Sequence, residues 1–201
     1  MKKWVIVIGT IVLIAGGLMF FQHRSEAPEV SQEPQEMDEP MSEAETTAAI
    51  EQAMDHVGEL EGLEEGIEKW AVRLLVASDE PLSDSELVAQ AEEAYQDRQD
   101  ALDVAEEIYD VDMSEGRIYA FIEQEVEQID EAFMESIASA HGLSLEAFLY
   151  DWEYDHFAYN YAWREMSTQL EEAFPMEEGE DAEAYRDRLR EQWQNKMDET
   201  R

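Results

Sequence analysis

The sequence predicts an all-α protein, in which an N-terminal transmembrane helix and an acidic linker precede an irregular bundle of about five or six helices. Three observations lead to this prediction. An early run of 18 residues carries no charge, prolines and glutamates follow it, and apolar side chains then recur at intervals of three and four residues. No downstream segment shows the alternation of a half-buried strand.

The uncharged run comprises residues 4–21, WVIVIGTIVLIAGGLMFF. At about 1.5 Å per residue it spans roughly 27 Å, close to the thickness of the hydrocarbon core of a bilayer. Lys2 and Lys3 precede the run, and acidic residues dominate after it. Because positive residues stay on the cytoplasmic side, we expect residues 1–3 to be a cytoplasmic tail and the domain to be extracytoplasmic, in a single-pass protein of the cell membrane.

A cleaved signal peptide is the competing interpretation, because Ser25, Glu26 and Ala27 have the small-x-small pattern of a cleavage site. The apolar run, however, is longer than the usual signal-peptide core of about 7–15 residues. Pro28 would also follow the cut, where its ring restricts the preceding residue. We therefore expect the run to be retained as a signal anchor.

The charge of the chain excludes one class of partner. There are 51 acidic residues against 13 basic ones, and the formal net charge is −38. Such a surface repels the phosphates of nucleic acids, so nucleic acid is not expected to be a direct partner. We interpret the acidity as a contribution to solubility, in preference to the alternative that it attracts a specific cationic partner. The absence of cysteine excludes disulfides, thiolate metal sites and a cysteine nucleophile.

Residues 22–42 contain three prolines among glutamates, which is typical of a disordered, self-repelling linker. The helical domain is expected to comprise residues 43–174. Ser42 and Ser83 are each followed three residues later by glutamate, the spacing of a capping box, so each is predicted to start a helix. The apolar stripes that follow include Ile50, Val57, Trp70, Leu74, Leu87, Ala91, Tyr95, Leu102, Ala105 and Ile108.

Ser114 is predicted to cap a shorter helix, which either continues through or bends near Phe133. Gly142 ends that segment and Ser144 starts the next helix. Pro175 stops this helix after about thirty residues.

No catalytic residue, metal site or cofactor is predicted. Asp110 and Asp112 resemble the start of a calcium loop, but Phe121 occupies the position where a bidentate glutamate is needed. Glu153 and His156 have the spacing of one half of a di-iron site, and the second half is missing. Phosphate-binding and nucleophile-elbow motifs are absent as well, so we do not expect an enzyme.

Residues 145–170 carry two apolar stripes. The first is typical of a core face and contains Leu145, Phe148, Leu149, Trp152, His156, Tyr159, Trp163, Met166 and Leu170. The second stripe, Tyr150, Tyr154, Phe157 and Tyr161, projects from a different side of the helix. Either the helix is packed on two sides, or these four candidate polypeptide-binding residues form an exposed groove for apolar segments of another chain.

Residues 175–201 are predicted to form a C-terminal amphipathic helix that docks on the domain. Its apolar positions, Tyr185, Leu189, Trp193 and Met197, recur every four residues. The segment also holds five of the 13 basic residues. Arg186, Arg190 and Trp193 are therefore the candidate residues for an alternative function, the binding of a dedicated partner through this helix.

Three segments resemble parts of the helical chaperone domain of SurA-type and PrsA-type extracytoplasmic foldases. Residues 102–126, LDVAEEIYDVDMSEGRIYAFIEQEV, resemble its long helix, turn and short helix. Residues 141–154, HGLSLEAFLYDWEY, are similar to its entry into the next helix, and residues 184–193, AYRDRLREQW, to its C-terminal helix. No parvulin prolyl-isomerase domain lies between residues 170 and 184, so isomerase activity is not implied.

The resemblance implies a membrane-anchored, chaperone-like module that binds unfolded or extended segments of exported polypeptides without catalysis. In the alternative, the chain is a structural or regulatory subunit that binds one protein of the cell envelope.

Overall fold

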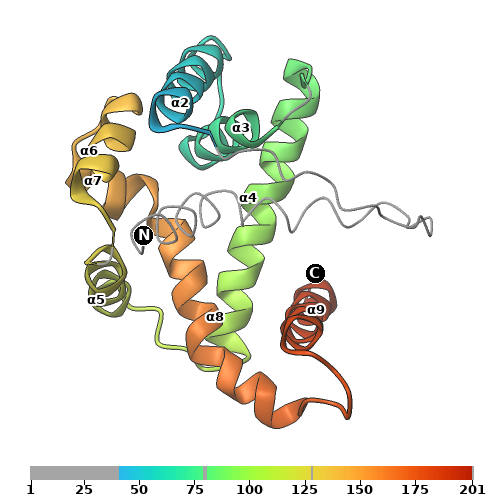
Figure 1. Ribbon diagram of the computed structural model, residues 1–201. Helices are drawn as coiled ribbons and strands as arrows, with labels where there is room; N and C mark the ends of the chain where they lie inside the picture. Colours follow the sequence, from blue (N-terminus) through green and yellow to red (C-terminus); the bar gives the residue numbers. More distant parts are fainter. Residues whose placement is uncertain (1–40, 79–80, 128, 201) are drawn as a thin grey trace. The chain divides into compact units, whose positions relative to one another are not determined.

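The structure, a computed structural model, describes residues 41–78, 81–127 and 129–200 (Figure 1). Within these ranges it contains eight α-helical segments, α2 to α9, one π-helical turn and no strand, which confirms the predicted all-α class for this part of the chain. No helix of the described residues is long and apolar enough to cross a membrane. The predicted anchor at residues 4–21, and most of the predicted linker, lie outside the described residues.

The chain divides into two compact units. Of the described residues, unit 1 comprises 41–78, 81–91, 126–127 and 129–148, and unit 2 comprises 92–125 and 149–200. The long helix α4, Asp84–Glu107, contributes its first two turns to unit 1 and the remainder to unit 2.

Unit 1 is built around α2, Glu43–Gly58, which packs against α3, Glu65–Ala77, and against α6, Glu131–Ala140. The short helix α7, Leu145–Ala147, follows α6. The apolar stripes predicted for α2 and α3 are buried here, because a helix with one apolar face must cover it with another element. The buried side chains of these helices include Ile50, Ala53, Val57, Trp70, Val72, Leu74, Met134 and Ile137.

Both predicted capping boxes are confirmed. The Ser42 hydroxyl accepts a hydrogen bond from the Glu45 N–H at 3.4 Å, and the Glu45 carboxylate accepts one from the Ser42 N–H at 2.8 Å. In the same way, the Ser83 hydroxyl accepts a hydrogen bond from the Glu86 N–H at 3.4 Å, and the Glu86 carboxylate accepts one from the Ser83 N–H at 3.0 Å. Each exchange satisfies two backbone groups that a helix start leaves without partners, which is why α2 and α4 begin directly after these serines.

Helix α6 ends at Ala140, as expected from the glycine at position 142. Gly142 has a φ of +70°, a conformation in which a side chain would be strained. Its N–H donates to the Ser139 carbonyl at 2.9 Å, and the Leu143 N–H donates to the Ala138 carbonyl at 2.9 Å. These two bonds form a Schellman motif. Ser144 then starts the next helix as predicted, because its hydroxyl accepts a backbone N–H from the first turn.

Unit 2 contains the second part of α4, most of α5, Glu115–Val126, and the helices α8, Tyr154–Ala173, and α9, Ala182–Thr200. Helix α8 runs alongside the second part of α4 (Figure 1), and the Gln169 amide donates to the Tyr109 carbonyl at 2.9 Å. The buried side chains of unit 2 include Ala94, Ala101, Val104, Ile118, Phe121, Ile122, Met166, Leu170, Leu189, Trp193 and Met197.

Two breaks raise the number of helices above the predicted five or six. The helix that starts after Ser114 ends at Val126, and α6 begins anew because Asp130 caps it by accepting the N–H groups of Ala132 and Phe133 at 3.0 and 3.3 Å. The predicted helix of about thirty residues is divided by a π-helical turn, Phe148–Trp152, between α7 and α8. A further difference is Ile108, which follows the end of α4 and is 50% exposed, although the sequence placed it on the apolar face.

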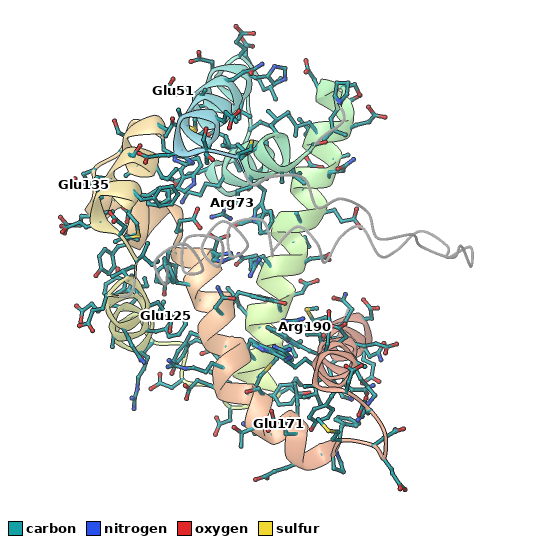
Figure 2. The ribbon with its side chains drawn as sticks, in the orientation of Figure 1. Glu51, Arg73, Glu125, Glu135, Glu171 and Arg190 are labelled. Atoms are coloured by element: carbon teal, nitrogen blue, oxygen red, sulfur yellow. The ribbon has the colours of Figure 1, made fainter. Side chains whose placement is uncertain are left out.

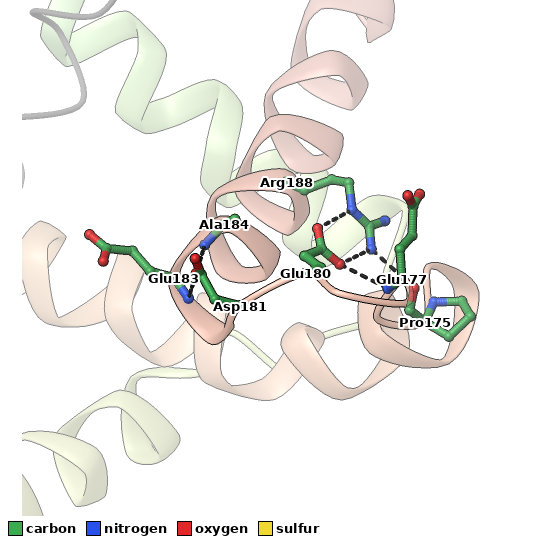
Figure 3. Close-up of polar contacts among 7 residues, drawn as sticks. All are labelled: Pro175, Glu177, Glu180, Asp181, Glu183, Ala184 and Arg188. Atoms are coloured by element: carbon green, nitrogen blue, oxygen red, sulfur yellow. Dashed lines mark hydrogen bonds and ion pairs between the residues drawn. The ribbon is translucent and has the colours of Figure 1, made fainter. Parts of the chain in front are cut away.

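A polar clasp holds the turn between α8 and α9 (Figure 3). Glu180 accepts two hydrogen bonds from the Arg188 guanidinium, both at 2.8 Å, and one from the Glu177 N–H at 2.9 Å. Arg188 also donates to the Pro175 carbonyl at 3.0 Å. Asp181 caps α9 by accepting two backbone N–H groups, each at 2.9 Å. Arg188 thereby connects the end of α8 to the second turn of α9.

From the Glu180–Arg188 ion pair we predict how the stability of the folded state depends on pH. The hydrogen bond from Arg188, and then that from the Glu177 N–H, lower the pKa of Glu180 from 4.5 to about 2. A carboxylate with a lowered pKa stabilises the folded state above its unfolded pKa, and this contribution is lost as the pH falls toward the folded pKa. Glu180→Gln should therefore be less stable than the wild type above pH 4.5, and the difference should shrink between pH 4.5 and 2.

Urea denaturation at a series of pH values measures this difference. Glu178→Gln is the matched control, because it removes one exposed carboxylate from the same turn. A difference between wild type and Glu180→Gln that stays constant from pH 5 to 2 would show that the ion pair does not support the turn.

Candidate functional site

Three tyrosines meet at the surface of unit 2. Tyr119 comes from α5, Tyr150 from the π-helical turn and Tyr154 from the first turn of α8. The ring centroids of Tyr119 and Tyr150 lie 5.0 Å apart at an interplanar angle of 81°, and those of Tyr119 and Tyr154 lie 6.0 Å apart at 86°. This edge-to-face geometry is the arrangement that aromatic rings prefer. All three side chains are partly exposed, and we call them the tyrosine cluster.

The tyrosine cluster has an acidic neighbour. Burial raises the pKa of the Tyr154 hydroxyl, and the charge of Glu115 and the neighbouring Tyr119 raise it further. Glu115 is exposed and lies four residues before Tyr119, so both project from the same side of α5. The cluster therefore combines apolar ring surface, phenolic hydroxyl groups and an adjacent carboxyl group.

The other two residues of the second stripe contact a different residue of α5. Phe157 and Tyr161 contact Phe121 of α5, with ring centroids 6.4 and 5.8 Å apart. The Arg164 guanidinium lies 4.4 Å from the centroid of Phe121 and 5.5 Å from that of Tyr161. Phe157 is partly exposed, whereas Tyr161 is only 5% exposed. The four candidate residues are thus divided, because Tyr150 and Tyr154 belong to the surface and Tyr161 belongs to the core.

The candidate residues of α9 form internal contacts. Trp193 is 1% exposed and stacks on Tyr159 and Trp163 of α8, with centroids 4.6 and 5.6 Å apart. The Arg98 guanidinium from α4 lies 3.8 Å from the centroid of Tyr159, and that of Arg190 lies 5.6 Å from the centroid of Trp163. We call these five residues the arginine–aromatic stack. It packs α9 against α8 within unit 2.

Arg186, the remaining candidate on α9, is exposed, and its guanidinium donates to the Ala182 carbonyl at 3.0 Å. Arg190 is visible on α9 in Figure 2, where its side chain extends from the helix toward the interior of unit 2. The surface that α9 offers to a partner is therefore smaller than its sequence suggested, since Trp193 and Arg190 already have partners in the fold.

Sequence reasoning missed two residues of these clusters. Tyr119 lies beside the stripe of Ile118, Phe121 and Ile122, and only the packing of α5 on α8 brings it to Tyr154. Arg98 lies among charged residues of α4, and its 5% exposure reflects tertiary contacts. The one local signal for Tyr119 is its four-residue distance from Glu115.

Among residues 41–78, 81–127 and 129–200, no group of three or more acidic or histidine side chains is placed to hold a metal ion. Asp112 instead accepts the Ser114 N–H at 3.2 Å, and its pKa is lowered by its hydrogen bonds to Ser114 and by Arg117. Glu153 is buried at the junction between the π-helical turn and α8, where it precedes the first residue of α8.

Comparison of the chain with protein-family models, with curated proteins and with solved structures found no match. The resemblance to the foldase chaperone domain therefore stays a prediction.

The arginine–aromatic stack predicts a large energetic role for Trp193. Trp193→Ala should lower the free energy of unfolding by about 3–5 kcal/mol, because it removes a fully buried ring and leaves a cavity. Urea denaturation followed by circular dichroism measures the change. Glu191→Ala, an exposed position on the same helix, should change stability by less than about 0.5 kcal/mol. A loss below about 1 kcal/mol for Trp193→Ala would mean that α9 is not held by this stack.

The division of the second stripe predicts unequal effects. Tyr161→Leu should lower the free energy of unfolding by more than about 1.5 kcal/mol, because a buried ring is lost from the contact with Phe121 and a cavity remains. Tyr154→Leu should lower the free energy of unfolding by a smaller amount, because the Tyr154 ring is partly exposed. The same denaturation experiment compares them, and equal losses would contradict the assignment of Tyr154 to the surface.

Proposed function

We propose that this chain is a membrane-anchored, extracytoplasmic module that binds unfolded or extended polypeptide segments without catalysis. The observation that supports this proposal is the tyrosine cluster, which offers three partly exposed rings on packed helical elements. The apolar run at residues 4–21 supports the membrane location. In this proposal residues 22–42 hold the domain away from the bilayer.

Tyrosine suits such a surface for two reasons. Its ring contributes apolar contact area while its hydroxyl bonds to backbone groups, so it accommodates many sequences. It also has few rotatable bonds, and the edge-to-face contacts with Tyr119 restrict Tyr150 and Tyr154 before any ligand arrives. A segment that binds here therefore loses less affinity to the ordering of side chains than it would on flexible residues.

The acidic surface supports the same proposal. Acidic side chains project outward from helices of both units, as Figure 2 shows for Glu51 of α2, Glu135 of α6 and Glu171 of α8, all of which are exposed. Net charge far from zero keeps proteins soluble through mutual repulsion. A module that holds an apolar segment would thereby resist aggregation of the complex.

The alternative, a subunit that binds one envelope protein through α9, has weaker support. Two of its three candidate residues, Arg190 and Trp193, take part in the arginine–aromatic stack. Crosslinking in intact membranes separates the two functions, because many captured proteins favour the module proposed here and one dominant species favours the dedicated subunit.

Suppression of aggregation tests the proposed function. The full chain, purified in lipid nanodiscs, should reduce light scattering by an unfolding client protein at stoichiometric amounts. The double variant Tyr119→Ser with Tyr154→Ser should lose most of this effect, because it removes two of the three rings. Tyr185→Ser, which removes a partly exposed tyrosine of α9, is the matched control.

If the wild-type chain leaves the scattering unchanged, the proposed function is wrong. If the double variant protects the client as well as the wild type does, then the tyrosine cluster is not the binding site.

A further inference from the structure

Aromatic rings in unit 2 repeatedly contact arginines. Among the described residues of unit 2, at least four guanidinium groups lie within 6 Å of a ring centroid, the range in which a cation is attracted to the negative face of the ring. The pairs are Arg98 with Tyr159 at 3.8 Å, Arg164 with Phe121 at 4.4 Å, Arg188 with Tyr185 at 5.3 Å and Arg190 with Trp163 at 5.6 Å. Each pair reduces the negative charge around its ring.

The charged group near the Tyr154 hydroxyl is acidic, whereas those near the Tyr159 hydroxyl are basic. The Tyr159 hydroxyl has Arg98 and Arg190 as its charged neighbours, whereas the Tyr161 hydroxyl has Glu165 and Asp112 as well as Arg117 and Arg164. Burial, and then the charge of Glu115 at the start of α5 and the neighbouring Tyr119, raise the pKa of Tyr154. The ring faces and this carboxylate together make the tyrosine cluster a site of negative potential at the surface of unit 2.

The complement of such a surface is a cation on an apolar stem. An arginine side chain fits both features, because its guanidinium stacks on aromatic faces and its methylene groups contact the rings. A carboxylate at the edge of the rings strengthens the contact with a guanidinium. High salt weakens this electrostatic attraction.

We infer that the tyrosine cluster, with Glu115 at its edge, selects extended polypeptide segments in which an arginine lies beside apolar residues. This inference rests on the proposed function, since it names the class of segment that the module binds. Arginine is favoured over lysine, because a planar guanidinium stacks on a ring while an ammonium remains more strongly hydrated.

Two peptides that differ in one charge test the inference. Both carry the same apolar residues and a fluorescent label, and one contains arginine where the other contains citrulline, its neutral analogue. Fluorescence anisotropy with the full chain in nanodiscs should show about two- to five-fold tighter binding of the arginine peptide, the effect of a cation on an exposed aromatic face. The preference should fall when the salt concentration rises to 0.5 M, at which the Debye length is well below about 8 Å.

Variants distinguish the cluster from the general acidity of the chain. Tyr154→Leu keeps the net charge and removes one ring, and Glu115→Gln keeps the rings and removes the adjacent carboxylate. Each should reduce the preference for arginine, whereas Glu172→Gln, which removes an exposed carboxylate of α8, should preserve it. Circular dichroism establishes that each variant is folded.

Three results would overturn the inference. Equal binding of both peptides would overturn it and leave the proposed function standing. An arginine preference that is unchanged in both Tyr154→Leu and Glu115→Gln would assign the selectivity to diffuse charge instead of the tyrosine cluster. Binding of neither peptide, together with unreduced client aggregation, would overturn both the inference and the proposed function.

Discussion

Helix α8 carries large aromatic side chains on two of its faces, and the arrangement of unit 2 depends on covering both. One face, with Tyr159 and Trp163, packs against Trp193 of α9. The other, with Phe157 and Tyr161, packs against Phe121 of α5. A helix that is apolar on two sides is stable only between two neighbours, so the sequence of α8 itself requires both α5 and α9.

The few basic residues of this acidic chain support the same packing. Arg98 is 5% exposed although burial of a charge is costly, and its guanidinium lies on the ring of Tyr159. Arg164 lies over the rings on the α5 side of α8, and Arg190 over Trp163 on the α9 side. Each arginine therefore covers an aromatic face and offsets part of the repulsion among the carboxylates.

The elements that sequence reasoning predicted correctly depend on interactions within five residues. The capping boxes at Ser42 and Ser83, and the helix end at Gly142, are of this kind. The cap of α6 by Asp130 also depends on neighbouring residues. The sequence did not predict it, because the apolar spacing continues across this position. The π-helical turn and the contact of Tyr119 with Tyr154 depend on tertiary packing, which periodicity along one helix does not describe.

The same limit explains why the four residues of one stripe have different neighbours, and why Tyr161 alone among them is buried. Tyr150, Tyr154, Phe157 and Tyr161 follow one side of the chain, but α5 presents the partly exposed Tyr119 to the first two and the buried Phe121 to the last two. The ring contacts with Phe121 pack α5 against α8. The tyrosine cluster lies beside that contact, so its rings are oriented by packed helical elements while part of their surface stays accessible, the combination that a preorganised binding site requires.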